Sequence, residues 1–120
     1  MAISEEKARI MITPKKVTEY LLASGFAPNL KGFSYIRDAI MAIQNIPLGM
    51  RQIYKGVYAL VAQRNVSTQP RVERAIRHAI QVACETPKFN DKFNKYLGNM
   101  KPKNGEFLML LYEILKMEAS

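Results

Sequence analysis

Residues 56–80 read GVYALVAQRNVSTQPRVERAIRHAI, two segments with helical spacing on either side of a short polar turn. In that turn, Asn65 is expected to adopt the left-handed backbone conformation that asparagine tolerates. Ser67 or Thr68 then caps the second segment, because a hydroxyl there accepts from the free N–H groups of the first helical turn. Two helices joined by about four residues are typical of a helix-turn-helix, which we predict over about residues 50–84.

The second segment, about residues 68–84, divides into an apolar and a polar half when it is drawn as a helix with about 100° per residue. The apolar half holds Val72, Ala75, Ile76, Ala79, Ile80, Val82 and Ala83. The polar half holds Arg71, Glu73, Arg74, Arg77, His78 and Gln81. We therefore expect one half to pack into the domain and the other half to face outward.

The polar half carries side chains that suit the major groove of DNA. Arginine matches guanine O6 and N7 with two parallel donors, and glutamate accepts from cytosine N4. Arg74 and Arg77 lie one turn apart and can reach successive base pairs, while Glu73 either reads a base or orients Arg77 through a salt bridge. Candidates for contacts to the DNA backbone are Ser67, Thr68, Arg71, His78 and Gln81. The competing interpretation is an ordinary amphipathic helix with a solvated, arginine-rich face.

The remainder of the chain has the spacing of amphipathic helices and no strand pattern. We predict helices at about residues 15–24, 31–45, 50–63, 68–84, 90–97 and 104–118. Gly25 is expected to end the first helix, and inward-facing positions include Leu21, Ile36, Leu60, Tyr96 and Leu111. The predicted fold is all-α, a single six-helix domain over residues 15–120 that follows a weakly specified leader, residues 1–14. The helix-turn-helix would be its third and fourth helices.

Composition excludes several classes of protein. The 120 residues suit one domain with a radius of about 14 Å, and the 48% apolar content argues against disorder. A single cysteine, Cys84, and a single histidine, His78, exclude a disulfide framework and the usual zinc sites. No catalytic constellation is evident, so we expect no enzyme, cofactor or metal site. No apolar run approaches the length of about 18 residues that spans a membrane, and no signal peptide is evident, so we expect a cytoplasmic protein.

The net charge of +8 is concentrated in one region. Residues 64–103 carry 9 basic and 3 acidic side chains, whereas residues 104–120 carry 1 basic and 3 acidic ones. A basic region of this kind suits a polyanionic partner, and double-stranded DNA is the one we expect. The lysines of this region are either phosphate contacts or solvated side chains, and the pattern leaves that open for Lys88, Lys92, Lys95, Lys101 and Lys103.

Three blocks of sequence together resemble one known family. Residues 71–80, RVERAIRHAI, resemble the recognition helix of the DNA-binding effector domain of the sporulation stage-zero response regulator, a transcription factor of spore formation. Residues 30–40, LKGFSYIRDAI, are similar to its second helix, and residues 101–107, KPKNGEF, to the entry to its last helix. The order and spacing of the blocks agree along roughly residues 15–118.

The resemblance implies that Glu73, Arg74 and Arg77 read a TGTCGAA-type box. It also implies pairs of domains on tandem boxes and contact with the sigma factor of RNA polymerase. Members of the family usually begin with a receiver domain that restrains the effector, and none is present here, so we expect constitutive DNA binding. The alternative is a protein-interaction module that binds RNA polymerase or a full-length homologue without specific DNA readout.

Overall fold

The structure is a computed structural model that describes residues 11–46 and 54–119. Within these ranges the chain forms six helices and no strand: α2 (Pro14–Ala23), α3 (Lys31–Gln44), α4 (Tyr54–Arg64), α5 (Gln69–Cys84), α6 (Pro87–Leu97) and α7 (Asn104–Ala119). The prediction of an all-α single domain is confirmed, and the Cα radius of gyration of 14.1 Å agrees with the expected value. The part of the predicted third helix at residues 50–53 lies outside the described residues.

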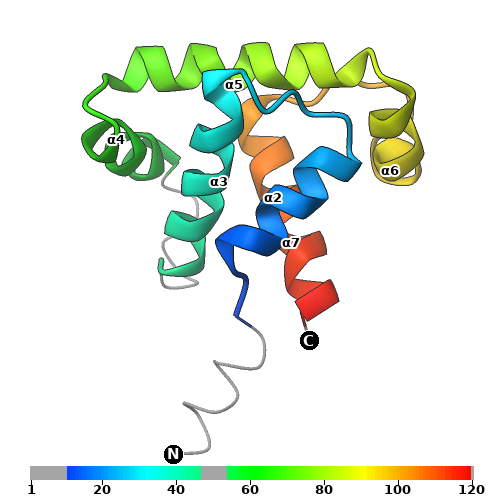
Figure 1. The fold of residues 1–120 in the computed structure, drawn as a ribbon, viewed down its shortest axis with the longest axis horizontal. Coiled ribbons are helices and arrows are strands. Elements are labelled where there is room, and N and C mark those ends of the chain that lie inside the picture. The colour runs from blue at the N-terminus through cyan, green and yellow to red at the C-terminus, as the bar shows by residue number, and fades with distance from the viewer. Residues whose placement is uncertain (1–10, 47–53, 120) are drawn as a thin grey trace, which may run out of the picture.

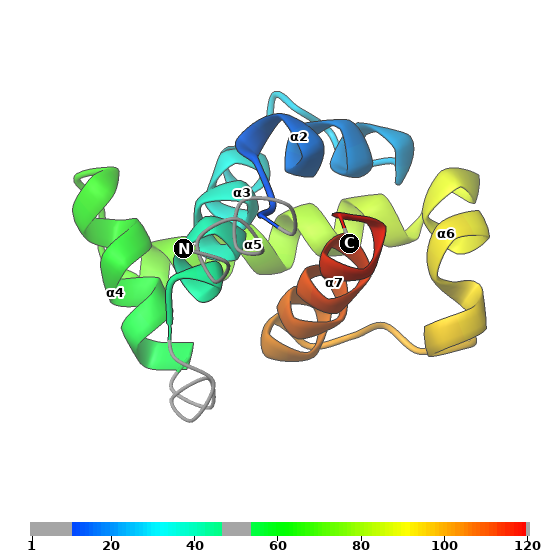
Figure 2. The same cartoon turned by 90° about the horizontal axis from the view of Figure 1, so that it is seen from below.

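Helix α5 is the central element of the domain. It runs along one side of the molecule, with α4 at its N-terminal end and α6 at its C-terminal end (Figure 1). Helices α2, α3 and α7 lie on the opposite side of α5, as the view from below also shows (Figure 2). The most extensive packing is between α3 and α5, followed by the contacts of α4 with each of them. One side of α5 is therefore covered by the domain and the other side is left open.

Four phenylalanines join α6 and α7 to the rest of the core. Phe107 on α7 lies with its ring centroid 5.3 Å from those of both Phe26 and Phe93. Phe89 and Phe93, one turn apart on α6, have centroids 4.6 Å apart. All four rings are buried, and ring pairs of this kind contribute about 0.5–1.5 kcal/mol each beyond the burial of their area.

A glycine on α3 brings the backbones of α3 and α5 together. A Cβ atom at Gly32 would collide with the backbone carbonyl of Ala75 and would lie 2.6 Å from the Cβ of Ala79. Real side chains do not approach this closely, so only glycine fits between the two helices. This backbone contact therefore adds to the buried side chains of α5, such as Val72 and Ile76, in setting the position of the helix.

The limits of the predicted core and leader need correction. Leu60 and Tyr96 were expected to face inward, but they are 48% and 42% exposed, because α4 and α6 lie at the ends of α5 and bury only a narrow stripe each. Ile12, within the predicted leader, is 1% exposed, and its N–H and C=O both bond to the side-chain amide of Gln44. Ile12 therefore belongs to the core, while Met11 and Thr13 beside it are exposed.

The beginning of α6 also differs from the prediction. The helix begins at Pro87, three residues before the expected start at residue 90. Thr86 is its N-cap, and the Thr86 hydroxyl accepts from the N–H of Phe89 at 3.2 Å. A threonine followed by proline is a common helix start, and this local signal would have placed the boundary correctly.

Candidate nucleic-acid interface

The turn between α4 and α5 places one left-handed residue after the end of α4. That residue is Val66, with φ of 50°, and not Asn65 as expected. The Ser67 N–H donates to the carbonyl of Ala62 at 2.9 Å, and the Val66 N–H donates to that of Gln63 at 3.5 Å. These two bonds satisfy the last carbonyls of α4 and reverse the chain toward α5.

Asn65 has a different role from the predicted one. Its side-chain amide donates to the carbonyl of Val61 at 2.8 Å and to Oδ2 of Asp38 at 3.0 Å. The first bond goes to a carbonyl that also accepts from the backbone N–H of Asn65 at 3.1 Å, and the second ties the turn to α3. Asn65 therefore anchors the end of α4, and the left-handed position lies at the next residue along the chain.

The N-terminus of α5 begins at a threonine cap. Thr68 has extended backbone geometry, and its hydroxyl accepts from the N–H of Arg71 at 3.4 Å. Of the two residues predicted as caps, Thr68 is therefore the cap, and Ser67 lies half-buried in the turn before it. Pro70 occupies the first turn of the helix, where its missing N–H has no helical partner to lose.

The division of α5 into two faces is confirmed. All of the predicted polar residues are exposed: Arg71, Glu73, Arg74, Arg77, His78 and Gln81. The predicted apolar residues are buried, except Ala75 and Val82, which are half-buried. Helices α2, α3 and α7 lie below α5 in Figure 1, and the opposite side of α5 is left open.

The charged groups on this face are not paired with one another. Among the described residues, no carboxylate lies within ion-pair distance of Arg71, Arg74 or Arg77, so the salt bridge considered between Glu73 and Arg77 is not formed. The Nε of Arg74 donates to the carbonyl of Pro70 on its own helix at 3.3 Å. The face therefore offers guanidinium groups and a carboxylate that remain available to a ligand.

A cleft runs along one edge of this face. We did not predict this cleft from the sequence. It has a volume of about 430 Å³ and lies between α5 and the segment that leads into α7. Arg77, Gln81 and Cys84 line it from α5, and Lys101 and Lys103 line it from the other side. Burial raises the pKa of the Cys84 thiol, and the ammonium group of Lys101 opposes that rise.

Comparison with known protein families decides which family has this arrangement. A family model described as "Sporulation initiation factor Spo0A C terminal" matches residues 17–115, which is most of the chain. The chain belongs to this family. The resemblance to the sporulation effector domain is thereby confirmed, and the matched residues include every described helix except the first residues of α2 and the last turn of α7.

Membership in the Spo0A C-terminal family decides the class of function. The family is a DNA-binding regulatory domain of sporulation transcription control and is not an enzyme family. In the described part of this chain, no group of three or more metal-ligating side chains occurs. Each helix in the same ranges is too short or too polar to cross a bilayer.

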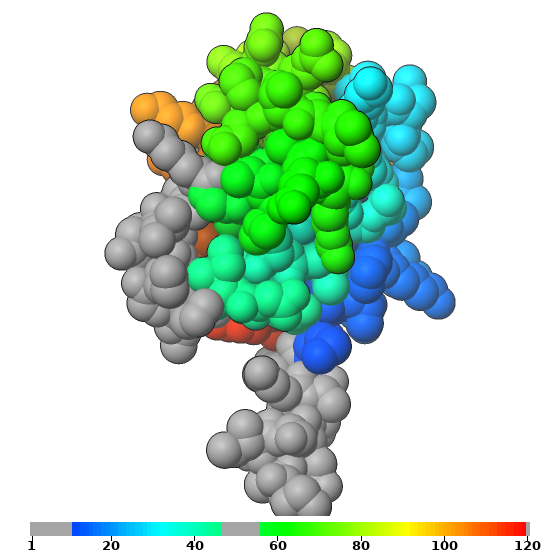
Figure 3. All heavy atoms as spheres, turned by 90° about the vertical axis from the view of Figure 1, so that its left-hand side faces the viewer, coloured from blue at the N-terminus to red at the C-terminus, as the bar shows by residue number. Residues whose placement is uncertain are grey.

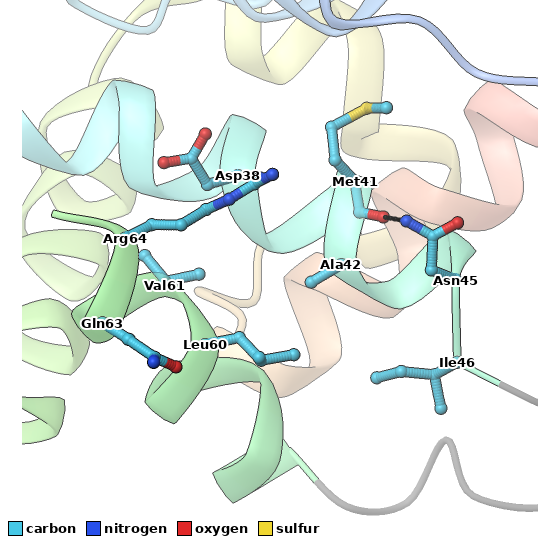
Figure 4. A pocket seen from close by; sticks show the side chains of 9 residues that line it. All are labelled: Asp38, Met41, Ala42, Asn45, Ile46, Leu60, Val61, Gln63 and Arg64. Carbon is cyan, nitrogen blue, oxygen red and sulfur yellow. Dashed lines mark hydrogen bonds between the residues drawn. The ribbon is translucent and has the colours of Figure 1, made fainter.

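A second concave surface of this domain lies between α3 and α4. Figure 3 looks onto that end of the molecule, where the surfaces of α4 and α3 adjoin. The groove has a volume of about 510 Å³, and its apolar lining includes Met41, Ile46 and Leu60 (Figure 4). Arg64 reaches from the end of α4 toward Asp38 on α3 at the rim of the groove. This groove does not include the polar face of α5.

Proposed function

We propose that this domain is a sequence-specific DNA-binding transcription regulator. In this proposal α4, the turn at residues 65–68 and α5 form a helix-turn-helix, and the exposed face of α5 enters the major groove. The observation that carries the proposal is the open polar face of α5, on which three arginines and a glutamate have no ion-pair partner among the described residues. A face that is already paired within the protein would have to break those bonds before it read a base.

The proposed base-reading residues are Glu73, Arg74 and Arg77. All three lie in the N-terminal two thirds of α5, the part that a recognition helix presents to base edges. Arg74 and Arg77 each match a guanine of a TGTCGAA-type box, and Glu73 accepts from a cytosine N4. The absence of a Glu73–Arg77 ion pair supports a direct reading role for Glu73 over an orienting one.

The proposed contacts to the DNA backbone surround these residues. The N-terminus of α5 lies at Thr68, at one end of this face, and the dipole of a helix start favours a phosphate. Arg71, His78 and Gln81 are exposed on the same face and complete the set together with Ser67. These contacts fix the position of the helix in the groove and carry no sequence information.

The decisive experiment compares a duplex that contains the box with a scrambled duplex at two salt concentrations. We expect Arg74→Ala and Arg77→Ala each to weaken binding to the box by about 1–3 kcal/mol and to reduce the preference for the box. Lys16→Ala is the control, because it removes one exposed positive charge from α2, on the covered side of α5. Wild-type binding that is equal on both duplexes and steeply salt-dependent would contradict the proposal and favour the protein-interaction alternative.

We also propose that two copies occupy tandem boxes and that the domain contacts the sigma factor of RNA polymerase. What supports a protein partner is the open, partly apolar groove between α3 and α4, with Leu60 48% exposed at its surface. Binding to duplexes that carry one or two boxes tests the first proposal, since paired domains bind the two-box duplex cooperatively. Independent occupation of both boxes would contradict it.

A further inference from the structure

The segment between α6 and α7 lies beside the polar face of α5. Lys101 and Lys103 from this segment line the same cleft as Arg77 and Gln81, although at least 20 positions separate them along the chain. Both lysines are exposed. The basic surface of the domain therefore extends sideways from α5 onto a second segment.

Hydrogen bonds hold this segment against α5. The side-chain amide of Asn104 donates to the backbone carbonyl of Glu73 at 2.9 Å. The N–H of Lys103 donates to Oε1 of Glu106 at 3.0 Å, and its carbonyl accepts from the N–H of Phe107 at 2.9 Å. Phe107 is fully buried in the aromatic cluster. The backbone that carries Lys103 is thus fixed to α5 on one side and to the core on the other.

The charges of the two lysines are not neutralised within the described part of the protein. No carboxylate there lies within ion-pair distance of either ammonium group. The carboxylate of Glu106, the nearest in sequence, is engaged with the backbone N–H of Lys103. Lys101 lines the same cleft as Cys84 of α5, so it lies beside that helix.

We propose that Lys101 and Lys103 form a second DNA-binding element, which contacts the phosphates of the strand beside the groove that α5 occupies. The proposal rests on the proposed function, because it requires α5 to lie in the major groove. That groove is about 12 Å wide, so a helix within it has a phosphate strand along each side. A pair of lysines held beside the helix meets one of these strands and supplies affinity without sequence preference.

The test compares the double variant Lys101→Gln/Lys103→Gln with the control Lys15→Gln/Lys16→Gln. Both remove two exposed positive charges, but the control charges lie at the start of α2, away from the open face of α5. Each is titrated into the box and scrambled duplexes over a series of salt concentrations. We expect the loop variant to weaken binding to both duplexes several-fold and to lower the slope of log K against log salt by about 1.8, or about 0.9 for each phosphate contact. The control should keep the wild-type slope.

A third variant tests the position of the two lysines separately from their charge. Asn104→Ala keeps both lysines and removes the bond to Glu73, and we expect it to weaken binding to both duplexes, by less than the double variant does. Thermal unfolding followed by circular dichroism checks that each variant is folded. Equal slopes for the loop variant and the control would overturn the proposal, and wild-type affinity of Asn104→Ala would overturn the part played by the tether. Neither result affects the proposed function, which fails only if the wild type loses its preference for the box.

Discussion

Two helices of this domain end in the same hydrogen-bonded turn, but glycine holds the left-handed position in one and valine holds it in the other. At the end of α2, Gly25 has φ of 86°, the Phe26 N–H donates to the carbonyl of Leu21 at 3.0 Å, and the Gly25 N–H donates to that of Leu22 at 3.3 Å. This turn is packed, since a Cβ atom at Gly25 would collide with the hydroxyl of Thr86.

The turn after α4 repeats these bonds around Val66, which is 96% exposed. A residue with a Cβ atom pays about 1–2 kcal/mol to adopt the left-handed conformation, and β-branching makes it rarer still. The turn at α2 joins elements of the core and is free of this strain. The turn that leads into the proposed recognition helix carries it on an open surface, and strained backbone of this kind is often found at functional sites.

The largest expected effect comes from removing the glycine. Gly25→Ala should lower the free energy of unfolding by about 2–4 kcal/mol, because the new Cβ meets both a left-handed backbone and the side chain of Thr86. Urea unfolding followed by circular dichroism measures the change. The double variant Gly25→Ala/Thr86→Ala should lose less than the sum of the two single variants, since Thr86→Ala removes the colliding oxygen. Additive losses would show that the collision contributes nothing.

Two threonine caps, one packed against the turn at Gly25 and one after the turn at Val66, provide a second, smaller contrast. The hydroxyl of Thr86 is half-buried and makes two bonds, since it also donates to the carbonyl of Ala83 at 2.8 Å. The hydroxyl of Thr68 is exposed and accepts only the long bond from Arg71. We expect Thr86→Ala to cost about 1–2 kcal/mol and Thr68→Ala about 0.5–1 kcal/mol of stability. Thermal and urea unfolding of the two variants, measured in parallel, test this contrast. A loss of stability in Thr68→Ala as large as that in Thr86→Ala would contradict it.

The smallest expected effect has the opposite sign. Val66→Gly should stabilise the domain by about 0.5 kcal/mol, because the gain from relieving the left-handed strain exceeds the extra chain entropy of glycine. Val66→Asn should do the same, and Val66→Ala, which keeps a Cβ atom, is the matched control and should change little. A melting temperature of Val66→Gly at or below that of the wild type would show that the valine is not strained.

Local patterns predicted most of the fold. The helical spacing located six helices, and the helical wheel of α5 separated its buried from its exposed residues, because these features depend on neighbours within a few positions. The stop at Gly25 follows from the same kind of local rule. The candidate face of Arg74 and Arg77 was therefore visible in the sequence.

The errors arose where a distant part of the chain decides the outcome. Asparagine is a residue type that tolerates the left-handed conformation, and this favoured Asn65 in the prediction. In the structure, the side chain of Asn65 instead donates to Asp38 on α3, a contact that local sequence does not report. Leu60 follows the apolar spacing of α4, but no element of the described structure covers it. The position of Lys101 and Lys103 beside α5 depends on the packing of α7, which no local pattern reports.

The close contact between α5 and Gly32 affects which substitutions this domain can tolerate during evolution. At Gly32, α3 meets the backbone of Ala75 and the Cβ of Ala79, whereas the outward side chains of Glu73, Arg74 and Arg77 make no hydrogen bond or ion pair to another helix within the described residues. We expect exchange of those side chains to leave the scaffold intact. If α5 reads DNA as proposed, target preference and thermodynamic stability can vary independently, and single substitutions can give new binding specificities.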